Sequence, residues 1–363
     1  MIQELRIPER EEILSLAASA GFEIAGVAPV TELPDFGRFA DWIERGNAGA
    51  MGYLTDHRAA LRRDVRTLLP SAQSVICVGK LYNGPEPCST DVSDTECGWI
   101  ARYAWGEDYH PVLRRGLEQL AQSLATVAGP FEWKACVDTA PVLERSLARA
   151  AGLGWIGKNT CLINQLRGSW FFLGELLTSL PLSASTETVP DRCGTCTRCI
   201  DACPTRAIVP RGDGYEIDSR LCISYLTIEL RGTIDEPLRA GMGRHVFGCD
   251  ICQDVCPWNG RSPSTERFSP LGENFAPPLE KLARLNESEF QRMFRSTPVS
   301  RARYRGFLRN VAIAMGNSGS PELLEPLRKL TRFEDATVQE QALWALQKLE
   351  SGIAACTESS SRY

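Results

Sequence analysis

Four closely spaced cysteines constrain this chain more than any other feature. Cys193, Cys196, Cys199 and Cys203 stand in the run CGTCTRCIDACP, and Pro204 follows directly. This C-x2-C-x2-C-x3-C-P spacing is the bacterial pattern for [4Fe-4S] ligation, in which three thiolates hold one cluster and the fourth reaches its neighbour. The run therefore predicts two iron–sulfur clusters. A zinc site needs only four ligands and is disfavoured.

A second run, GCDICQDVCPWN, contains only three cysteines. When it is aligned on its proline, the first ligand position falls on Val246, which cannot bind iron. The crossing rule assigns one cluster to Cys193, Cys196, Cys199 and Cys256. It assigns three corners of the other cluster to Cys203, Cys249 and Cys252, so one corner is open.

Cys222 is the only other cysteine between the two runs, and we predict that it is the eighth ligand. A three-iron or site-differentiated cluster is the alternative, because ligand counting does not exclude it. The other cysteines lie outside this segment, and Cys77 and Cys136 stand in apolar, β-rich runs typical of buried positions.

The chain has 363 residues, 43% of them hydrophobic, which predicts a globular protein of two or three domains. A formal net charge of -5 excludes a wholly basic surface, so any nucleic-acid contact requires a local basic patch. The first residues lack the apolar core of a signal peptide, and no later stretch has the length and apolarity of a membrane span. We therefore expect a cytoplasmic protein that does not contact membranes.

Three domains are predicted. Residues 1–180 mix helical periods at 11–21 and 110–128 with β-rich runs at 74–82 and 131–137, which indicates an α/β (α+β) domain. A Ser-, Thr- and Pro-rich linker at 181–190 opens a ferredoxin-like two-cluster domain, 181–265. Residues 266–363 are predicted to be all-α.

The pattern RNVAIAMG at 309–316 recurs as EQALWALQ at 340–347, which favours a HEAT-like arrangement for the last domain. A plain helical cap is the alternative, since two copies are few for a repeat.

Two apparent cofactor motifs fail on their context. GLGWIG, with Gly152, Gly154 and Gly157, matches the dinucleotide fingerprint and has Glu175 downstream, but a helical period precedes it where a strand is required. It is interpreted as a helix end and tight turn. Asp108 and His110 resemble the start of the cobalt-binding D-x-H-x-x-G loop of corrinoid mutases, but Leu113 replaces its glycine.

Asp138 follows the β-rich run FEWKACV. Strand-end carboxylates in α/β domains often point into the ligand crevice, which makes Asp138 a candidate catalytic residue. A helix-entry cap is the alternative.

Together the motifs RYAWGEDYH, VDTAPVLERS, GLGWIGKNT, GSWFFLGEL, CISYLTIELRG and the two cysteine runs resemble those of epoxyqueuosine reductases over nearly the whole chain. The resemblance implies two [4Fe-4S] clusters and a base-off cobalamin without a protein histidine on cobalt. It implies reduction of the epoxide of epoxyqueuosine at wobble position 34 of the tRNA anticodon, which gives queuosine, the last step of its biosynthesis, and releases water.

The resemblance also implies roles for individual residues. Asp138 would be the proton donor. The residues implied near the corrin are Arg62, Tyr103, Asp138, Leu162, Leu173, Ser224, Cys249 and Asp250. The implied partners are tRNAs for Asp, Asn, His and Tyr and a low-potential donor such as flavodoxin or ferredoxin, and a monomer is expected.

The required basic patch is found at 292–310, where six arginines occur without an acidic residue. A solvated helix face is the usual fate of such a charge run, but with the resemblance it indicates phosphate binding. The predicted tRNA contacts are Glu229, Leu230, Arg231, Arg301, Arg303, Arg305 and Arg309.

Two other functions are compatible with the cysteine runs. A reductive dehalogenase-like corrinoid enzyme pairs the same cofactors, but such proteins usually carry a twin-arginine export signal, and none is found here. An electron carrier of ferredoxin type, fused to a helical scaffold, would leave residues 1–180 without a role.

Overall fold

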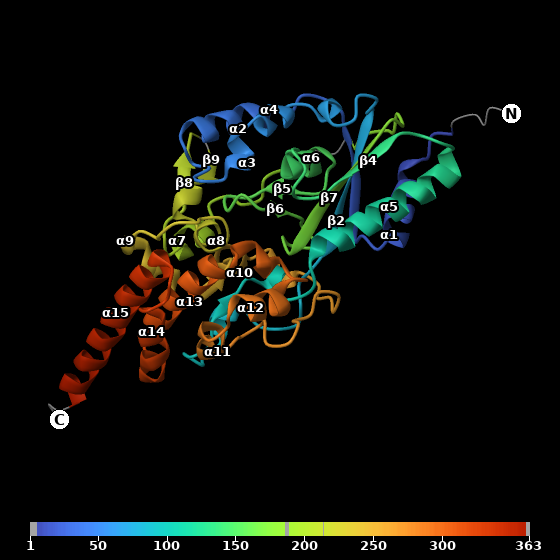
Figure 1. Ribbon diagram of the computed structural model, residues 1–363. Helices are drawn as coiled ribbons and strands as arrows, with labels where there is room; N and C mark the ends of the chain where they lie inside the picture. Colours follow the sequence, from blue (N-terminus) through green and yellow to red (C-terminus); the bar gives the residue numbers. More distant parts are fainter. Residues whose placement is uncertain (1–5, 186–188, 213, 361–363) are drawn as a thin grey trace.

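The computed structural model describes residues 6–185, 189–212 and 214–360, and side chains up to residue 353 (Figure 1). Its largest sheet has the order β1-β2-β7-β4, formed by Ile24–Pro29, Ser74–Leu81, Phe171–Thr178 and Trp133–Cys136. All three strand pairs are antiparallel. The region up to residue 180 is therefore of the α+β type, and the crevice rule for open parallel sheets does not explain the position of Asp138.

Helices cover both faces of this sheet (Figure 1). The residues of α1 (Arg10–Ser19) and α5 (Tyr109–Ala128) pack on one face, and α6 (Glu144–Ala150) packs on the other. α5 buries Leu113, Leu117, Leu120 and Leu124 on one stripe, as the 3.6-residue period requires. Three short helices, α2 (Asp35–Glu44), α3 (Gly52–Thr55) and α4 (Arg58–Leu61), connect β1 to β2.

The GLGWIG stretch follows a helix, as predicted, and its Trp155 and Ile156 form a short strand. Gly152 has φ +79°, and the N–H of Leu153 donates to the carbonyl of Ala148, so the segment ends α6 in a glycine turn. The next elements are the hairpin of β5 (Trp155–Ile156) and β6 (Leu162–Ile163).

The cysteine segment is built from short elements with a second hairpin, β8 (Ile208–Arg211) and β9 (Gly214–Ile217). Its helices are α7 (Arg198–Ala202), α8 (Ile223–Ile228), α9 (Glu236–Arg239) and α10 (Ile251–Asp254). Such short elements let the chain turn repeatedly around the cysteine side chains.

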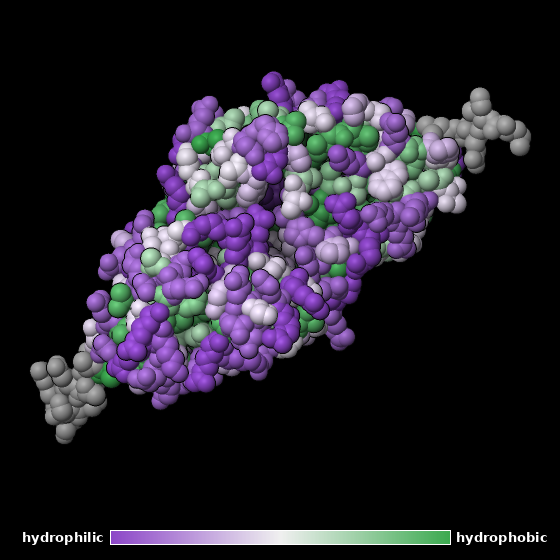
Figure 2. Space-filling model, in the orientation of Figure 1, coloured by the Kyte–Doolittle hydropathy of each residue, from purple (hydrophilic) through white to green (hydrophobic). Residues whose placement is uncertain are grey.

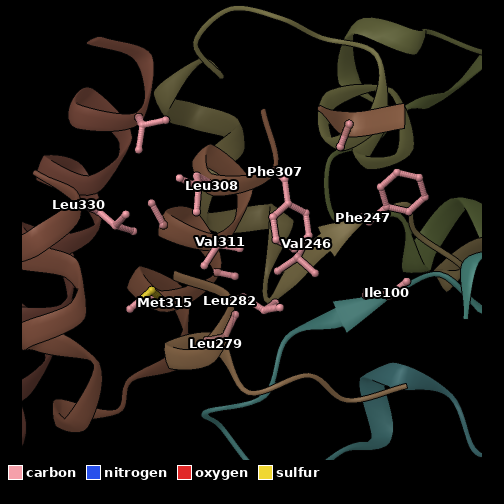
Figure 3. Close-up of a cluster of buried hydrophobic side chains, with 14 of the residues drawn as sticks. Ile100, Val246, Phe247, Leu279, Leu282, Phe307, Leu308, Val311, Met315 and Leu330 are labelled. Atoms are coloured by element: carbon pink, nitrogen blue, oxygen red, sulfur yellow. The ribbon is translucent and has the colours of Figure 1, made fainter. Parts of the chain in front are cut away.

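Val246, at the position where a cysteine is missing, lies in a strand. β10 (His245–Phe247) pairs in parallel with β3 (Trp99–Ile100), and Val246 is fully buried. Figure 3 shows it among Ile100, Leu282 and the side chains of the C-terminal helices. Because this core needs an apolar side chain, the second cysteine run begins one ligand short.

The C-terminal region is helical, as expected. It contains α11 (Leu279–Ala283), α12 (Glu287–Phe294), α13 (Tyr304–Ser318), α14 (Leu324–Leu330) and α15 (Ala336–Ser360). The two similar sequence patterns lie in α13 and α15, which pack so closely that a Cβ on Gly316 would approach Ala345 Cα to 2.6 Å. The HEAT-like arrangement and the domain boundaries stay predictions, since residues 100–105 and 246–247 share the core of these helices.

In the described part of the chain, no helix is both long and apolar enough to cross a lipid bilayer. The predicted linker at 181–190 includes residues 186–188, which lie outside the described residues.

Candidate active site and cluster-binding segments

The cysteines of the predicted first cluster lie together. Burial, followed by the neighbouring thiols of Cys193, Cys256 and Cys196, raises the pKa of Cys199 to about 11. Cys256 comes from the second run, so the structure brings this crossing residue to the first group, which is Cys193, Cys196, Cys199 and Cys256.

The second group is drawn from three segments. Burial raises the pKa of Cys249 well above its usual value, and the thiols of Cys222 and Cys203 act in the same direction. The Cys252 thiol is likewise affected by Cys249 and Cys222. Cys222 therefore lies with Cys203, Cys249 and Cys252, where the open corner was expected.

Both cysteine groups have the donor type that iron–sulfur clusters require. Each group supplies four thiols, the donors that iron–sulfur clusters use. In addition, the buried indole N–H of Trp155 has no hydrogen-bond partner of good geometry, yet it acts on the Cys193 thiol, as a donor to a cluster ligand would.

Asp138 occupies a turn after β4 in a left-handed conformation, with φ +46°. Its backbone N–H donates to Glu144 Oε1 at 2.5 Å, and its Oδ2 lies 3.0 Å from His110 Nε2. The side chain is 52% exposed. α6 begins only at Glu144 and Leu143 precedes it, so the helix-cap alternative for Asp138 is wrong.

His110 lies between two carboxylates, since its Nδ1 is 2.7 Å from Asp108 Oδ1 and its Nε2 contacts Asp138. Burial acts to lower the pKa of His110, but the hydrogen bonds to Asp108 and Asp138 outweigh it and raise the pKa to about 9. Both ring nitrogens are engaged by carboxylates, so the imidazole is held in one orientation beside Asp138.

Two acidic residues, Glu144 at the start of α6 and Glu175 in β7, carry raised pKa values near Asp138. Burial, followed by the charge of Asp138, raises the pKa of Glu144 to about 8. Glu175 is fully buried in β7 with both carboxyl oxygens unpartnered, and burial followed by the charge of Glu144 raises its pKa well above its usual value. Glu175 therefore holds a proton inside the fold instead of binding a ribose.

Three of the residues implied near the corrin lie close to Asp138 or to the second cysteine group. Burial and the charges of Asp138 and Asp250 raise the pKa of Tyr103 far above its usual value, which places its hydroxyl near both carboxyl groups. Ser224 Oγ donates to the carbonyl of Cys249 at 3.5 Å. Burial, then the charge of Asp254, raises the pKa of Asp250 to about 7, and its Oδ2 accepts from the N–H of Arg102.

The other implied corrin residues have buried or half-buried side chains. Arg62 is 7% exposed and donates to the carbonyls of Tyr53 and Arg58. Leu162 is buried in the core under α6, and Leu173 packs against that core.

A cavity of about 410 Å³ opens beside these groups and brings together three distant segments. Its lining residues are Ala50, Met51, Tyr53, Glu229, Arg231, Ser300, Arg301 and Arg303. Arg301 donates twice to the Glu229 carboxylate, at 3.0 and 3.2 Å, and its guanidinium lies 5.5 Å from the Tyr53 ring centroid. The charge of Asp138 acts on both Tyr53 and Arg301. Figure 2 shows hydrophilic residues around a hollow near the middle of one face.

Sequence reasoning missed half of this lining. Residues 50–53 and Ser300 carry no recognisable motif, and only the packing of three segments makes them neighbours. Burial, followed by the charge of Glu229, raises the pKa of Tyr53 to about 12, so its hydroxyl stays protonated beside Arg301.

The arginines of the predicted basic patch are not equivalent. Arg303 is exposed, whereas Arg305 pairs with Glu334 and Asp335, each at 3.3 Å. Arg309 is fully buried and donates to the carbonyls of Leu226, Leu230 and Gly232. The expected phosphate contact of Arg309 is therefore wrong, because its guanidinium stabilises the 226–232 turn and does not reach the surface.

Comparison with known proteins agrees with this geometry. The family models "4Fe-4S double cluster binding domain" and "Epoxyqueuosine reductase QueG, DUF1730" match residues 192–259 and 62–139. The chain is 40% identical over 339 residues to the epoxyqueuosine reductase of Xanthomonas campestris, covering 92% of this chain and 94% of that protein. It is 36% identical over 344 residues to the Escherichia coli protein of that name, covering 94% and 89%.

A solved structure is similar over the same length. The crystal structure of epoxyqueuosine reductase with an epoxyqueuosine-modified tRNA-Tyr stem loop has a TM-score of 0.83 and 28% sequence identity. The match covers 93% of this chain and 89% of that one.

Proposed function

The chain belongs to the epoxyqueuosine reductase family, and we propose on this basis that it reduces the epoxide of epoxyqueuosine in the tRNA anticodon to give queuosine. The observation that carries the proposal is the placement of Asp138, whose charge acts on Tyr53 and Arg301 in the lining of the cavity. Neither a dehalogenase nor an electron carrier accounts for identity to these reductases over nine tenths of the chain.

The electrons would reach the site through two [4Fe-4S] clusters. The first cysteine group and the second cysteine group would each hold one. Ser224 and Asp250 adjoin the second group and, with Tyr103 and Arg62, would border a base-off cobalamin, which supplies two-electron reduction of a carbon–oxygen bond when it is bound. The second cluster would then be the one nearer the substrate.

Asp138 would supply the proton that the leaving epoxide oxygen requires. Its Oδ2 is oriented by His110, and its backbone N–H is held by Glu144, so hydrogen bonds fix the carboxyl group in one arrangement. The overall reaction takes two electrons and two protons, leaves a carbon–carbon double bond in the modified base, and releases water. The role of His110 is to position Asp138 rather than to bind a metal.

The tRNA would approach over the cavity. Arg303, exposed at the start of α13, is suited to a backbone phosphate, and the Glu229–Arg301 pair with Leu230 and Arg231 would surround the turned-out base. Arg305 lies two residues further along, and its surface pairs with acidic residues are weak enough to exchange for phosphate.

Mass spectrometry of nucleosides tests the reaction. The protein, reconstituted anaerobically with iron, sulfide and cobalamin, is expected to convert epoxyqueuosine in tRNA to queuosine with a low-potential reductant. The same tRNA without the protein is the control. Conversion of a chlorinated aromatic substrate with epoxyqueuosine left intact would contradict the proposal.

Salt dependence tests the tRNA surface. Arg303→Gln is expected to weaken tRNA binding and to reduce the slope of log affinity against log salt by about one. Arg328→Gln, which removes an exposed arginine on α14 paired with Glu325 and Glu350, is the matched control and should leave the slope unchanged. An unaltered slope for Arg303→Gln would remove that residue from the interface.

A further inference from the structure

The β5–β6 hairpin of the sheet region reaches both cysteine groups. Its strands pair Trp155 with Ile163 and Ile156 with Leu162, and the intervening turn spans residues 157–161. This turn is rigid: the N–H of Gly157 donates to the carbonyl of Cys161, and Arg145 of α6 donates to the carbonyl of Thr160. Such a fixed turn can hold donors and charges at set positions beside the thiols.

The hairpin brings a fixed cation to the first cysteine group. Lys158 Nζ donates to the carbonyls of Gly194 and Cys196, at 2.7 and 3.0 Å, so its ammonium is fixed beside this group. Cys196 is itself one of the predicted ligands of the first cluster.

Packing holds Trp155 in place. The ring is 1% exposed and makes an edge contact with Trp258, with ring centroids 4.9 Å apart. Trp258 follows Cys256, the crossing ligand of the first group. The indole N–H finds no partner of good geometry among the described protein atoms, which is unusual for a buried tryptophan and points to an acceptor that the cluster provides.

The second group has different surroundings. From the hairpin it receives the Asn159 amide, which donates to the carbonyl of Cys252 at 3.2 Å, and the thiol of Cys161 beside Cys252. Asp250 adjoins Cys249 in the chain and brings a buried carboxyl group to this side, where its Oδ2 accepts from the N–H of Arg102. Asp191 Oδ1 accepts from the N–H of Cys193 in the first group, at 2.7 Å, but Asp191 is exposed and its charge is screened by solvent.

We propose that Trp155 and Lys158 raise the reduction potential of the first cluster above that of the second. An added electron makes a cluster more negative, and N–H donors to its sulfur ligands or a fixed cation stabilise that charge. An electron from an external one-electron, low-potential donor then resides mainly on the first cluster. From there it moves to the second cluster, which delivers it to the substrate side. This inference rests on the proposed function, because it assumes that both groups carry clusters.

Redox titration of the reconstituted protein, followed by EPR and film voltammetry, tests the proposal. For Lys158→Met we expect the ratio of reduced to oxidised first cluster at fixed potential to fall about tenfold, which is about 59 mV for one electron. Trp155→Phe keeps the ring but removes the N–H, and it should lower the ratio about threefold. The wave of the second cluster should stay in place in both variants.

Two controls separate charge from packing. Lys158→Arg keeps a cation and donors and should restore most of the potential, while Lys329→Met removes an exposed lysine on α14 and should move neither wave. Unchanged potentials in Lys158→Met and Trp155→Phe, with iron content intact, would overturn the inference. If Lys158→Met loses iron, Trp155→Phe decides the question. Wild-type protein that binds no clusters would instead overturn the proposed function.

Discussion

The electron side and the proton side of the site are built in opposite ways. The electron side, the two cysteine groups, uses side chains whose spacing along the chain already fits the ligand pattern. The proton side, Asp138, His110 and Glu144, joins three elements by hydrogen bonds around a turn with positive φ. Ligation tolerates a flexible chain because iron–sulfur bonds fix the geometry, whereas proton transfer requires a position that the protein itself must hold.

The largest effect is expected from Cys222, the one ligand on the electron side that is remote from both runs. Cys222→Ser should reduce iron from about eight to about four per chain and abolish turnover, because the second cluster loses a corner. Iron and sulfide analysis with EPR measures this. Cys161→Ser, at the cysteine that touches Cys252 without a predicted ligand role, is the control and should keep about eight irons. If Cys222→Ser keeps about eight irons too, a site-differentiated four-iron cluster gains support, whereas about seven irons in the wild-type protein would indicate the three-iron alternative.

A substitution at Asp138 should have the opposite effect, with loss of turnover but no loss of iron. Asp138→Asn is expected to keep both clusters and bound corrinoid but to lower kcat about 10²- to 10⁴-fold, because the amide cannot donate an acidic proton. Single-turnover assays together with metal analysis check this. Cluster loss in this variant would break the separation between the two sides, and near-normal turnover would remove Asp138 from the chemistry.

His110 should affect only the positioning of Asp138. Since its pKa is raised to about 9, the imidazolium is present at neutral pH and is lost as pH rises through about 9. His110→Gln should lower kcat about tenfold with KM unchanged and remove the fall in activity near pH 9. A pH–rate profile tests this, and persistence of the alkaline limb in the variant would show that another group titrates there.

The smallest effect concerns stability. The pKa of Glu144 is raised to about 8 in the fold. The stabilisation of the fold by its protonated carboxyl group is therefore fully present below about pH 4.5 and is lost as pH rises through about 8. Glu144→Gln keeps an acceptor for the Asp138 N–H and should raise the Tm at pH 8 by about 2–4 °C. Thermal unfolding at pH 5.5 and pH 8 measures the difference. An equal change at both pH values would contradict the titration of Glu144.

Local sequence patterns determined much of the scaffold. The apolar period of α5, the glycine turn after α6, and the β-rich runs that became β2 and β4 could all be read directly, since each depends on residues close in sequence. The same holds for the ligand spacing of the first run. The antiparallel sheet order was not accessible, because strand pairing joins residues up to about a hundred positions apart.

Tertiary structure decided which charges can act. Arg303 and Arg309 look alike in a basic stretch, yet one reaches solvent and the other is buried against three carbonyls. Glu144, Glu175 and Tyr53 belong to no motif that predicts their raised pKa values. Burial and the approach of distant charges set these properties, and both follow from packing rather than from residue spacing. The sequence by itself determined which ligating and ionisable side chains are present, and the fold determined which of them lie in contact.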